Sequence, residues 1–249
     1  MSKSQVWKLP LSFLNFLKQL FLARWRSLLL LLIGVYLPLQ MFEILAVEVW
    51  EEGGFGWDTP ILVAIHAYSR TQLDIFAVTL TKFGSFRIIS FAIAAIALLL
   101  FFRKRWRSLV FLLTATLGSA VINRTAKEFM HRMRPDLWTS LTPEFDYAFP
   151  SGHAMTSMTL IATLVILTWG SIWCWLVLIF GSLFVVAIAW TRLYLGVHFP
   201  SDILAGWMVS LAWVIGVSVF IKPQVTSAIG VEEPSVEETS LLPEESTSN

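Results

Sequence analysis

Long apolar stretches separated by shorter polar segments form the main pattern of this 249-residue chain. A membrane-spanning helix needs roughly 17 to 25 mainly apolar residues, and six stretches approach that length. They are Leu28–Val47, Phe86–Phe102, Leu109–Ala126, Ala154–Gly170, Ile172–Trp190 and Ile203–Ile221. The third is the weakest, because its strictly apolar part ends at Ile122 and Asn123–Ala126 must prolong the helix. The pattern predicts an all-α integral membrane protein with six transmembrane helices in a bundle.

Both ends of the chain differ from this six-span domain, which we place at residues 28–222. In residues 1–27, apolar residues recur at helical spacing beside lysines and an arginine, which predicts a cytoplasmic arm with an interfacial amphipathic helix. The apolar residues are Leu11, Leu14, Leu17 and Phe21. Residues 223–249 are rich in Pro, Ser, Thr and Glu, a composition that cannot bury enough apolar surface to offset its ordering entropy. We therefore predict a disordered acidic cytoplasmic tail.

Basic residues give the predicted orientation. The connection between the second and third apolar stretches carries Arg103, Lys104, Arg105 and Arg107, and the N-terminal arm carries five more basic residues. The positive-inside rule places both in the cytoplasm. The connections at residues 48–85, 127–153 and 191–202 then open on the non-cytoplasmic face. We expect a cell (inner) membrane protein with these loops outside or in the periplasm, although an internal membrane with a lumenal face satisfies the same topology.

Composition supports the membrane class and excludes other classes. The chain is 56% hydrophobic and 14% charged, with a mean hydropathy of +0.70, so it has more apolar surface than a soluble core of this size buries. The net charge is +1, and neither end of the chain has the pattern of a nucleic-acid-binding patch. The single cysteine, Cys174, lies in an apolar run, which excludes a disulfide framework and a thiol-rich metal site.

Three short segments that the topology assigns to one face carry most of the unusual polar residues. They read K-E-F-M-H-R-M-R-P from Lys127, P-S-G-H from Pro150 and R-L-Y-L-G-V-H-F-P-S-D from Arg192. Lys127 and Arg134 are seven residues apart, so both cations point one way if this segment is helical. With Arg192 they offer the point charge and the guanidinium forks that bind phosphate oxygens. Ser151 and Gly152, just before a predicted helix, direct a hydroxyl and backbone N–H groups at the anion.

Two histidines and an aspartate complete this candidate site. His198 and Asp202 are four residues apart, close enough for the carboxylate to fix the imidazole tautomer and leave the other nitrogen free to attack phosphorus. His153 is placed to protonate the leaving oxygen and then to activate the water that cleaves the phosphohistidine. We expect no metal and no cofactor, because the nearby carboxylates lack the clustering of two-metal phosphatases. These carboxylates are Asp136, Glu144, Asp146 and Asp202.

These motifs resemble the signature of the type 2 phosphatidic acid phosphatases, which share active-site motifs with vanadium haloperoxidases. The signature is K-x6-R-P, then P-S-G-H, then S-R-x5-H-x3-D, and the chain departs from it only at Thr191, where the family usually has Ser. The resemblance covers residues 127–202 by motif and most of the chain by layout. It implies phosphate binding by Lys127, Arg134, Ser151, Gly152 and Arg192, with His198 as nucleophile, Asp202 as its partner and His153 as acid.

The expected function is hydrolysis of a lipid phosphomonoester or diphosphate, such as phosphatidate, phosphatidylglycerol phosphate or a polyprenyl diphosphate, with the bilayer as surroundings. Two alternatives stay open on the residues alone. A phosphotransferase would pass the phosphate to another lipid, and a non-enzymatic anion or lipid transporter would use the cations as a pathway. A haloperoxidase fits six spans poorly. The motifs choose neither the lipid nor the oligomeric state.

Several polar residues also have ordinary structural explanations. We expect Arg132 and His131 to do no more than reach headgroups, and Asp202 before an apolar run also suits a helix N-cap. Asp58 and His66 could line the entrance, but a solvated surface is the simpler expectation. Glu43 lies within the first span, where an acid costs about 2.5 to 3.5 kcal/mol on insertion scales, so it either has a function or faces the bundle interior. We assign no chemistry to Trp57, Trp138 and Trp207.

Overall fold

A computed structural model describes residue 25 and residues 27–224, and this part of the chain is helical, without strands. Its elements are the π-helix η1 (Leu32–Tyr36) and the α-helices α3 (Leu37–Glu52), α4 (Asp58–His66), α5 (Thr71–Phe83), α6 (Phe86–Phe102), α7 (Trp106–Met130), α8 (Gly152–Leu167), α9 (Ile172–Tyr194) and α10 (Pro200–Ile221). The predicted interfacial helix of the N-terminal arm and the predicted acidic tail fall almost entirely outside the described residues.

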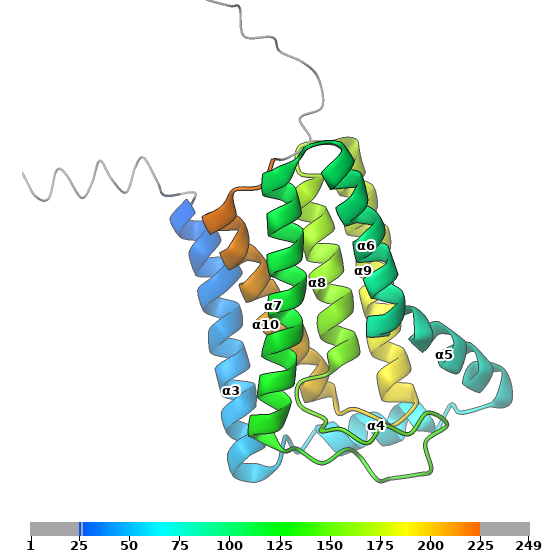
Figure 1. Ribbon diagram of the computed structural model, residues 1–249. Coiled ribbons are helices and arrows are strands. Elements are labelled where there is room, and N and C mark those ends of the chain that lie inside the picture. Colours follow the sequence, from blue (N-terminus) through cyan, green and yellow to red (C-terminus); the bar gives the residue numbers. More distant parts are fainter. Residues whose placement is uncertain (1–24, 26, 225–249) are drawn as a thin grey trace, which may run out of the picture.

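Each of the six apolar stretches contains one long helix (Figure 1). The doubtful third stretch becomes α7, which continues to Met130 and so supplies the prolongation that a span requires. Among the described residues, four helices have the length and composition of a membrane span: Ser27–Glu52, α7, α9 and α10. A fifth arises if α5 and α6, which meet at 41°, form one broken span. Because α8 has only 16 residues, the count of six spans stays a prediction.

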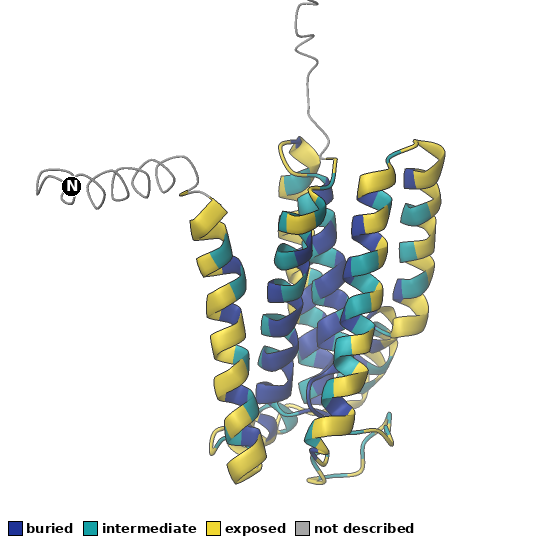
Figure 2. Cartoon of the chain, turned by 60° about the vertical axis from the view of Figure 1, so that its left-hand side comes forward, coloured by how far each residue is buried: buried dark blue, intermediate teal, exposed yellow. Residues whose placement is uncertain are grey.

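Burial follows the position of each helix in the bundle. Helix α8 packs against α7, α9 and α10, while α3 packs on the outside of α10. Figure 2 shows the buried residues gathered on the inner faces, with exposed residues along the outer side of the peripheral helices. Large apolar side chains such as Ile44, Phe91 and Leu183 lie on these exposed faces. A soluble protein rarely exposes so much contiguous apolar surface, so this is an integral membrane protein.

Small residues bring the inner helices close together. A Cβ atom added at Gly118 of α7 would lie 2.2 Å from Cζ2 of Trp213 on α10. The same indole donates a hydrogen bond from Nε1 to the Ala115 carbonyl oxygen at 3.0 Å. Close approach over a glycine is a common way for helices to associate in membranes, where packing replaces the hydrophobic drive. Gly118 therefore fixes how α10 sits against α7.

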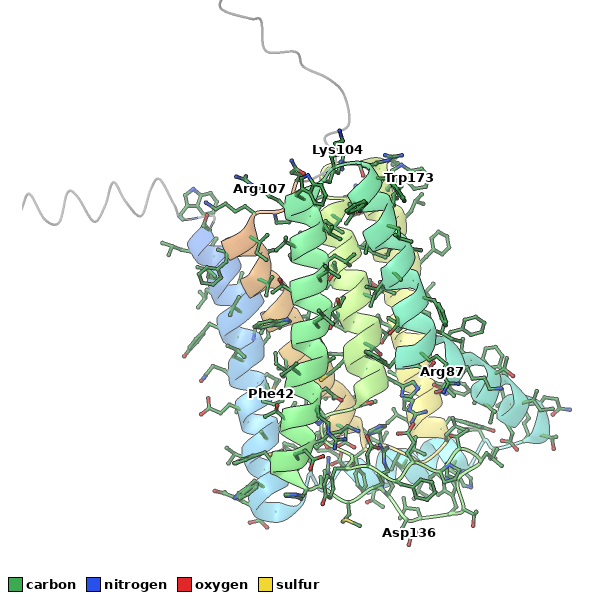
Figure 3. The ribbon with its side chains drawn as sticks, viewed as in Figure 1. Phe42, Arg87, Lys104, Arg107, Asp136 and Trp173 are labelled. Atoms are coloured by element: carbon green, nitrogen blue, oxygen red, sulfur yellow. The ribbon has the colours of Figure 1, made fainter. Side chains whose placement is uncertain are left out.

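The two ends of the bundle carry different segments. Lys104 and Arg107 lie at one end, and Asp136, in the connection between α7 and α8, lies at the opposite end (Figure 3). The segment 48–85, which we predicted as a loop, contains α4 and α5. Helix α4 contacts α9 and α10 beneath the bundle end, because its Leu62 and Asp58 are buried there.

The expectation that Glu43 of the first span faces the bundle interior is wrong. Its side chain is exposed on the outer side of α3 and does not face the bundle interior. It accepts a hydrogen bond from Nε2 of Gln40 at 2.9 Å. Among the described residues, the hydrogen-bond partner of this carboxylate therefore lies one turn earlier on the same helix.

Candidate active site

The three motif segments meet at the bundle end that holds the connection between α7 and α8. Lys127 lies in the last turn of α7, and His153 lies in the first turn of α8. Arg192 lies in the last turn of α9, His198 in the short connection that follows, and Asp202 in the first turn of α10. Helix ends from four elements thus bring residues up to 75 positions apart together, as the motif pattern predicted.

Two carboxylates in the connection between α7 and α8, Glu144 and Asp146, lie between Lys127, Arg134 and Arg192. Glu144 pairs with Arg192 through its Oε1 atom, and its Oε2 atom lies 2.7 Å from Nη2 of Arg134. Asp146 lies 2.5 Å from Nζ of Lys127 and also pairs with Arg134. We call Lys127, Arg134, Arg192, Glu144 and Asp146 the open cluster, because the two carboxylate side chains remain 27% and 47% exposed. The three cations therefore converge on positions that the carboxylate oxygens of Glu144 and Asp146 occupy.

Glu144 marks the point where the cations and both histidines converge. Its Oε1 atom lies 3.9 Å from Nδ1 of His153, and its Oε2 atom lies 3.9 Å from Nε2 of His198. A carboxylate here stands in for two oxygens of a phosphate, since both present paired anionic oxygens to a guanidinium fork. An anion at this position would contact two arginines and both imidazoles.

The condition under which Lys127 and Arg134 would share a helix face, a helix that continues through both residues, is not met. Helix α7 ends at Met130, and His131 adopts a left-handed conformation with φ of +47°. Arg134 lies in the irregular segment beyond it, where its Nε donates to the Asp146 carbonyl oxygen at 2.8 Å. The two cations converge nevertheless, because both bind the side chain of Asp146.

Asp146 illustrates the electrostatics of the open cluster. Its partial burial raises the pKa, but the hydrogen bonds and charges of Lys127 and Arg134 outweigh that effect and hold the pKa below its usual range. The carboxylate is therefore ionised at neutral pH. Three cations face two carboxylates, and the open cluster keeps one excess positive charge for an arriving anion.

The contacts of His198 identify its tautomer. Nδ1 lies 3.3 Å from Oδ2 of Asp202, and Nε2 lies 3.0 Å from Nη1 of Arg134. A guanidinium can only donate, so Nε2 accepts from Arg134, and the protonated Nδ1 donates a hydrogen bond to Oδ2 of Asp202. Full burial and then the charges of Arg134, Arg192, Lys127 and His153 hold the pKa of His198 well below its usual range. The free base therefore offers its Nε2 lone pair toward the open cluster.

The start of α8 supplies His153 as predicted, but Ser151 has a different immediate role. Ser151 is fully buried and caps the helix, with Oγ accepting from the Ala154 N–H at 3.5 Å. Its own N–H donates to the Asp202 carbonyl oxygen at 3.1 Å. Among the described residues, neither Ser151 nor Gly152 hydrogen bonds to Glu144 or Asp146. Both remain at the helix N-terminus, where the dipole favours a negative charge.

Arg132 and Asp58 are both buried, although the sequence favoured a headgroup contact for Arg132 and a solvated surface for Asp58. Arg132 pairs with Asp202 through Nη1 and lies 2.8 Å from Oδ2 of Asp58 through Nη2. We call Asp58, Arg132 and Asp202 the closed cluster, because their side chains are at most 4% exposed. The N-cap explanation of Asp202 is correct in part: the cap is Phe199, whose N–H donates to Oδ2 of Asp202 at 2.8 Å.

The sequence signals for these residues were weak. Arg132 stands two residues before a motif arginine and looks like any basic residue at a membrane edge. Thr81 of α5, which accepts from Nη1 of Arg192 at 2.8 Å, carries no motif at all. His66 stacks on Trp138 with ring centroids 3.8 Å apart, so this tryptophan packs against α4. Within the described residues, no group of three or more His, Cys, Asp or Glu side chains is arranged to hold a metal ion.

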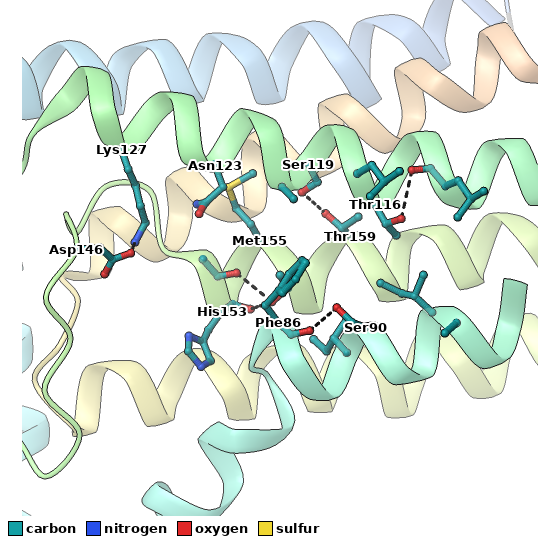
Figure 4. A pocket seen from close by; sticks show the side chains of 18 of the residues that line it. Phe86, Ser90, Thr116, Ser119, Asn123, Lys127, Asp146, His153, Met155 and Thr159 are labelled. Atoms are coloured by element: carbon teal, nitrogen blue, oxygen red, sulfur yellow. Dashed lines mark hydrogen bonds and ion pairs between the residues drawn. The ribbon is translucent and has the colours of Figure 1, made fainter.

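A cavity of about 550 Å³ leads away from the site between α6, α7 and α8 (Figure 4). Its polar end includes Lys127, Asp146 and His153, while residues such as Phe86 and Ile93 line the apolar part. The cavity thus joins a charged head region to an apolar groove that runs along the helices. That shape suits an amphipathic molecule with one anionic end.

Comparison with known proteins gives concordant matches. The family model described as PAP2 superfamily matches residues 108–225. An undecaprenyl-diphosphatase of Sulfolobus acidocaldarius is 28% identical over 197 residues, which cover 75% of this chain and 90% of that protein. Phosphatidylglycerophosphatase B of Bacillus subtilis is 34% identical over 116 residues, which cover 45% of this chain and 56% of that protein.

A solved structure has the same fold over most of the chain. It is the crystal structure of a transmembrane PAP2-type phosphatidylglycerolphosphate phosphatase from Bacillus subtilis, with a TM-score of 0.67 and 27% identity. The likeness covers 76% of this chain and 97% of that one. The segment matched by the family model also contains all three motifs, from Lys127 to Asp202. The chain thus resembles the PAP2 superfamily in its three motifs, in its helical fold and in its relatives.

Proposed function

We propose that this phosphoric ester hydrolase of the PAP2 type cleaves a lipid phosphomonoester or diphosphate through a phosphohistidine formed on His198. One observation carries the proposal: the Glu144 carboxylate is held by Arg134 and Arg192 and lies 3.9 Å from a ring nitrogen of each histidine. A phosphoryl group that replaced this carboxylate would lie between a nucleophile and an acid, with two guanidinium groups on its oxygens.

The reaction divides into two displacements. In the first, the Nε2 lone pair of His198 forms the N–P bond while the P–O bond to the lipid breaks, and His153 gives its proton to the leaving oxygen. In the second, a water oxygen attacks phosphorus, His153 takes the proton of that water, and the N–P bond breaks to release phosphate. Lys127, Arg134 and Arg192 stabilise the charge that develops on the phosphoryl oxygens, as in other phosphoryl transfers.

The cavity supports a lipid as substrate. The anionic head would displace Glu144 at the charged end, and the acyl or prenyl chain would lie along the apolar groove past Phe86 and Ile93. The tail stays in apolar surroundings both in the bilayer and in the groove, so a lipid can bring its head to the charged end without exposing its tail to water. The relatives named for undecaprenyl diphosphate and phosphatidylglycerol phosphate support the same class.

We assign the site to the non-cytoplasmic face of the cell membrane, with both termini in the cytoplasm. The support is the separation of charge along the bundle: the basic connection with Lys104 and Arg107 lies at the end opposite to the site (Figure 3). By the positive-inside rule the basic end is cytoplasmic. Single cysteines placed at Lys104 and at Asp136 test this assignment when a fluorescent thiol label is applied to intact cells from outside. We expect labelling at position 136 alone, and labelling at position 104 alone would reverse the assignment.

The experiment that tests the function is phosphate release by purified protein from a panel of lipid phosphates and diphosphates. Wild-type protein should release phosphate, and His198→Ala should lose about 10³-fold or more of that activity while eluting as the same folded species. Acid-labile radioactivity on the wild type after brief exposure to ³²P-labelled substrate, absent from His198→Ala, would identify the phosphohistidine. Hydrolysis retained by His198→Ala would refute the assigned nucleophile, and strict dependence on an added lipid acceptor would indicate phosphotransfer.

A further inference from the structure

The side of His198 that faces away from the open cluster is bounded by three buried charges. Asp202 Oδ2 lies 3.3 Å from Nδ1 of His198, and Asp202 Oδ1 accepts from Nη1 of Arg132. Nη2 of Arg132 reaches Asp58 at 2.8 Å. The PAP2 motif residues include His198 and Asp202, but neither Arg132 nor Asp58. The contacts of the proposed nucleophile therefore continue beyond the motif.

Arg132 is fixed on several sides. Its Nη1 donates to Ser201 Oγ at 2.7 Å, and its guanidinium carbon lies 4.4 Å from the centroid of the Phe199 ring. Gly54 covers it, with φ of +136°, and a Cβ atom there would come within 2.0 Å of Nη2. A guanidinium confined in this way has one position in which it can bridge two carboxylates.

Asp58 is fixed just as firmly from the other direction. Its Oδ2 atom accepts from Ser201 Oγ at 2.6 Å, and its Oδ1 atom accepts from the Ser201 N–H at 3.0 Å. It reaches these groups from α4, 143 positions earlier in the chain. Asp58 therefore ties the first turn of α10, which carries Asp202, to the end of the bundle.

The charges explain why a third group is needed. Two carboxylates buried side by side cannot both stay ionised without a cation between them, and a protonated Asp202 would lose the negative charge that faces Nδ1–H of His198. With Arg132 in place, the closed cluster carries a net charge of −1. This negative cluster beside Nδ1 stabilises the positive ring formed during attack on phosphorus, while the positive open cluster beside Nε2 faces the phosphoryl oxygens.

We propose that Arg132 and Asp58 are positioning residues that act through Asp202: they hold its carboxylate ionised and oriented so that His198 presents Nε2 to the substrate. This inference rests on the proposed function of His198. Neither residue touches the substrate in this account, so the loss of either should appear in kcat and leave KM nearly unchanged.

A double-mutant cycle tests the inference with the full-length protein and the lipid that gives the highest phosphate release. Arg132→Gln should lower kcat about 10²-fold, the cost of a small misplacement of reacting groups, with KM within about threefold. Arg132→Lys, which keeps the charge and loses the fork, should lose about tenfold. Asp202→Asn should lose about 10³-fold to 10⁴-fold. The double variant Arg132→Gln/Asp202→Asn should be within about threefold of Asp202→Asn alone, because residues that act as a unit are not additive.

The kcat losses in the double-mutant cycle distinguish a positioning role of Arg132 from a purely structural one. A double variant whose loss equals the product of the two single losses would overturn the inference, since a purely structural role is additive with Asp202. Retention of wild-type kcat by Arg132→Gln would overturn it as well. If Arg132→Gln does not fold, Asp58→Asn replaces it in the same cycle, with about a tenfold loss expected alone and none beyond Asp202→Asn.

Controls separate this inference from the proposed function. Arg124→Gln removes an exposed arginine of α7, the helix that precedes Arg132 in the chain. Arg124 is paired with Glu128 at 2.6 Å, and its loss should change kcat by less than twofold. If wild type releases phosphate and His198→Ala does not, the function stands whatever the cycle gives. If His198→Ala keeps full activity, the proposed function and this inference are both overturned, because Arg132 and Asp58 would have no nucleophile to position.

Discussion

The open and closed clusters are built from the same residue types and differ in what surrounds them. In the closed cluster, Asp58, Arg132 and Asp202 are enclosed by α4, α10 and the residues after α7, with side chains at most 4% exposed. In the open cluster, Glu144 and Asp146 come from an irregular segment and keep 27% and 47% of their side-chain surface exposed.

This difference separates two uses of ionic contacts. Breaking a fully buried pair leaves a charge without compensation and is strongly unfavourable, so the closed cluster is permanent. Carboxylates that are 27% and 47% exposed already keep part of their hydration. Glu144 and Asp146 can therefore yield their positions to a phosphate, which replaces them as partner of the cations. We therefore expect changes in the open cluster to alter substrate handling, and changes in the closed cluster to alter stability and the orientation of His198.

The largest effect should follow loss of an arginine from the open cluster. Arg192→Ala should lower kcat/KM for lipid phosphate hydrolysis about 10³-fold, since a positioned arginine contributes that much to phosphoryl transfer. Arg192→Lys should recover part of the loss, because the charge remains and the fork is gone. Initial rates of phosphate release measure both. A loss below tenfold for Arg192→Ala would mean that this arginine does not bind the reacting phosphoryl group.

The second prediction compares the free energy of unfolding after removal of one carboxylate from each cluster. Asp58→Ala should lower the free energy of unfolding by about 3 to 4 kcal/mol, because it leaves Arg132 buried without one partner. Asp146→Ala should change it by about 1 kcal/mol or less, because the Asp146 side chain is 47% exposed and water screens its ion pairs. Reversible unfolding in mixed detergent micelles measures the two values. Equal losses for the two variants would contradict the distinction between permanent and exchangeable contacts.

The pH dependence of activity should sharpen the role of the open cluster. Burial and three nearby cations lower the pKa of His198 well below 6.5, and attack needs the neutral ring. Activity should therefore persist as pH falls through 6.5 and disappear only below it. Arg134→Gln removes one cation and should move the acidic limb of kcat/KM upward, toward 6.5. Coincident limbs in wild type and variant would exclude Arg134 as a cause of the shift.

The smallest effect concerns the carboxylate that occupies the proposed phosphate position. Glu144→Gln should lower KM about two- to fivefold, equal to about 0.4 to 1 kcal/mol, because a neutral amide competes less with the substrate for Arg134 and Arg192. Glu128→Gln, a change at an exposed pair, is the matched control and should leave KM unchanged. An increase in KM for Glu144→Gln would show instead that this carboxylate assists substrate binding.

The motif residues were predictable one by one, while their surroundings were not. Spacing alone indicated that His198 and Asp202 pair, and the contact at 3.3 Å agrees with that prediction. For Lys127 and Arg134, spacing gave a common direction only if one helix carried both residues, and α7 ends at Met130 before it reaches Arg134. Helix ends depend on local capping as well as on periodicity, so a conclusion that requires a helix to continue through an end is the least secure kind.

The amino-acid sequence by itself determined the helical apolar stretches and the polar residues that meet at one end of the bundle. Hydrophobic periodicity is a local property, and the alternation of helices across a bundle carries the motifs to a common end. Only the tertiary structure decided that Arg132 and Asp58 are buried and that Glu144 lies among the cations. Burial of a charge requires a partner, and here the partners lie as far as 74 positions away in the chain. No local pattern records such a distant partner, because it becomes a neighbour only after the helices have packed.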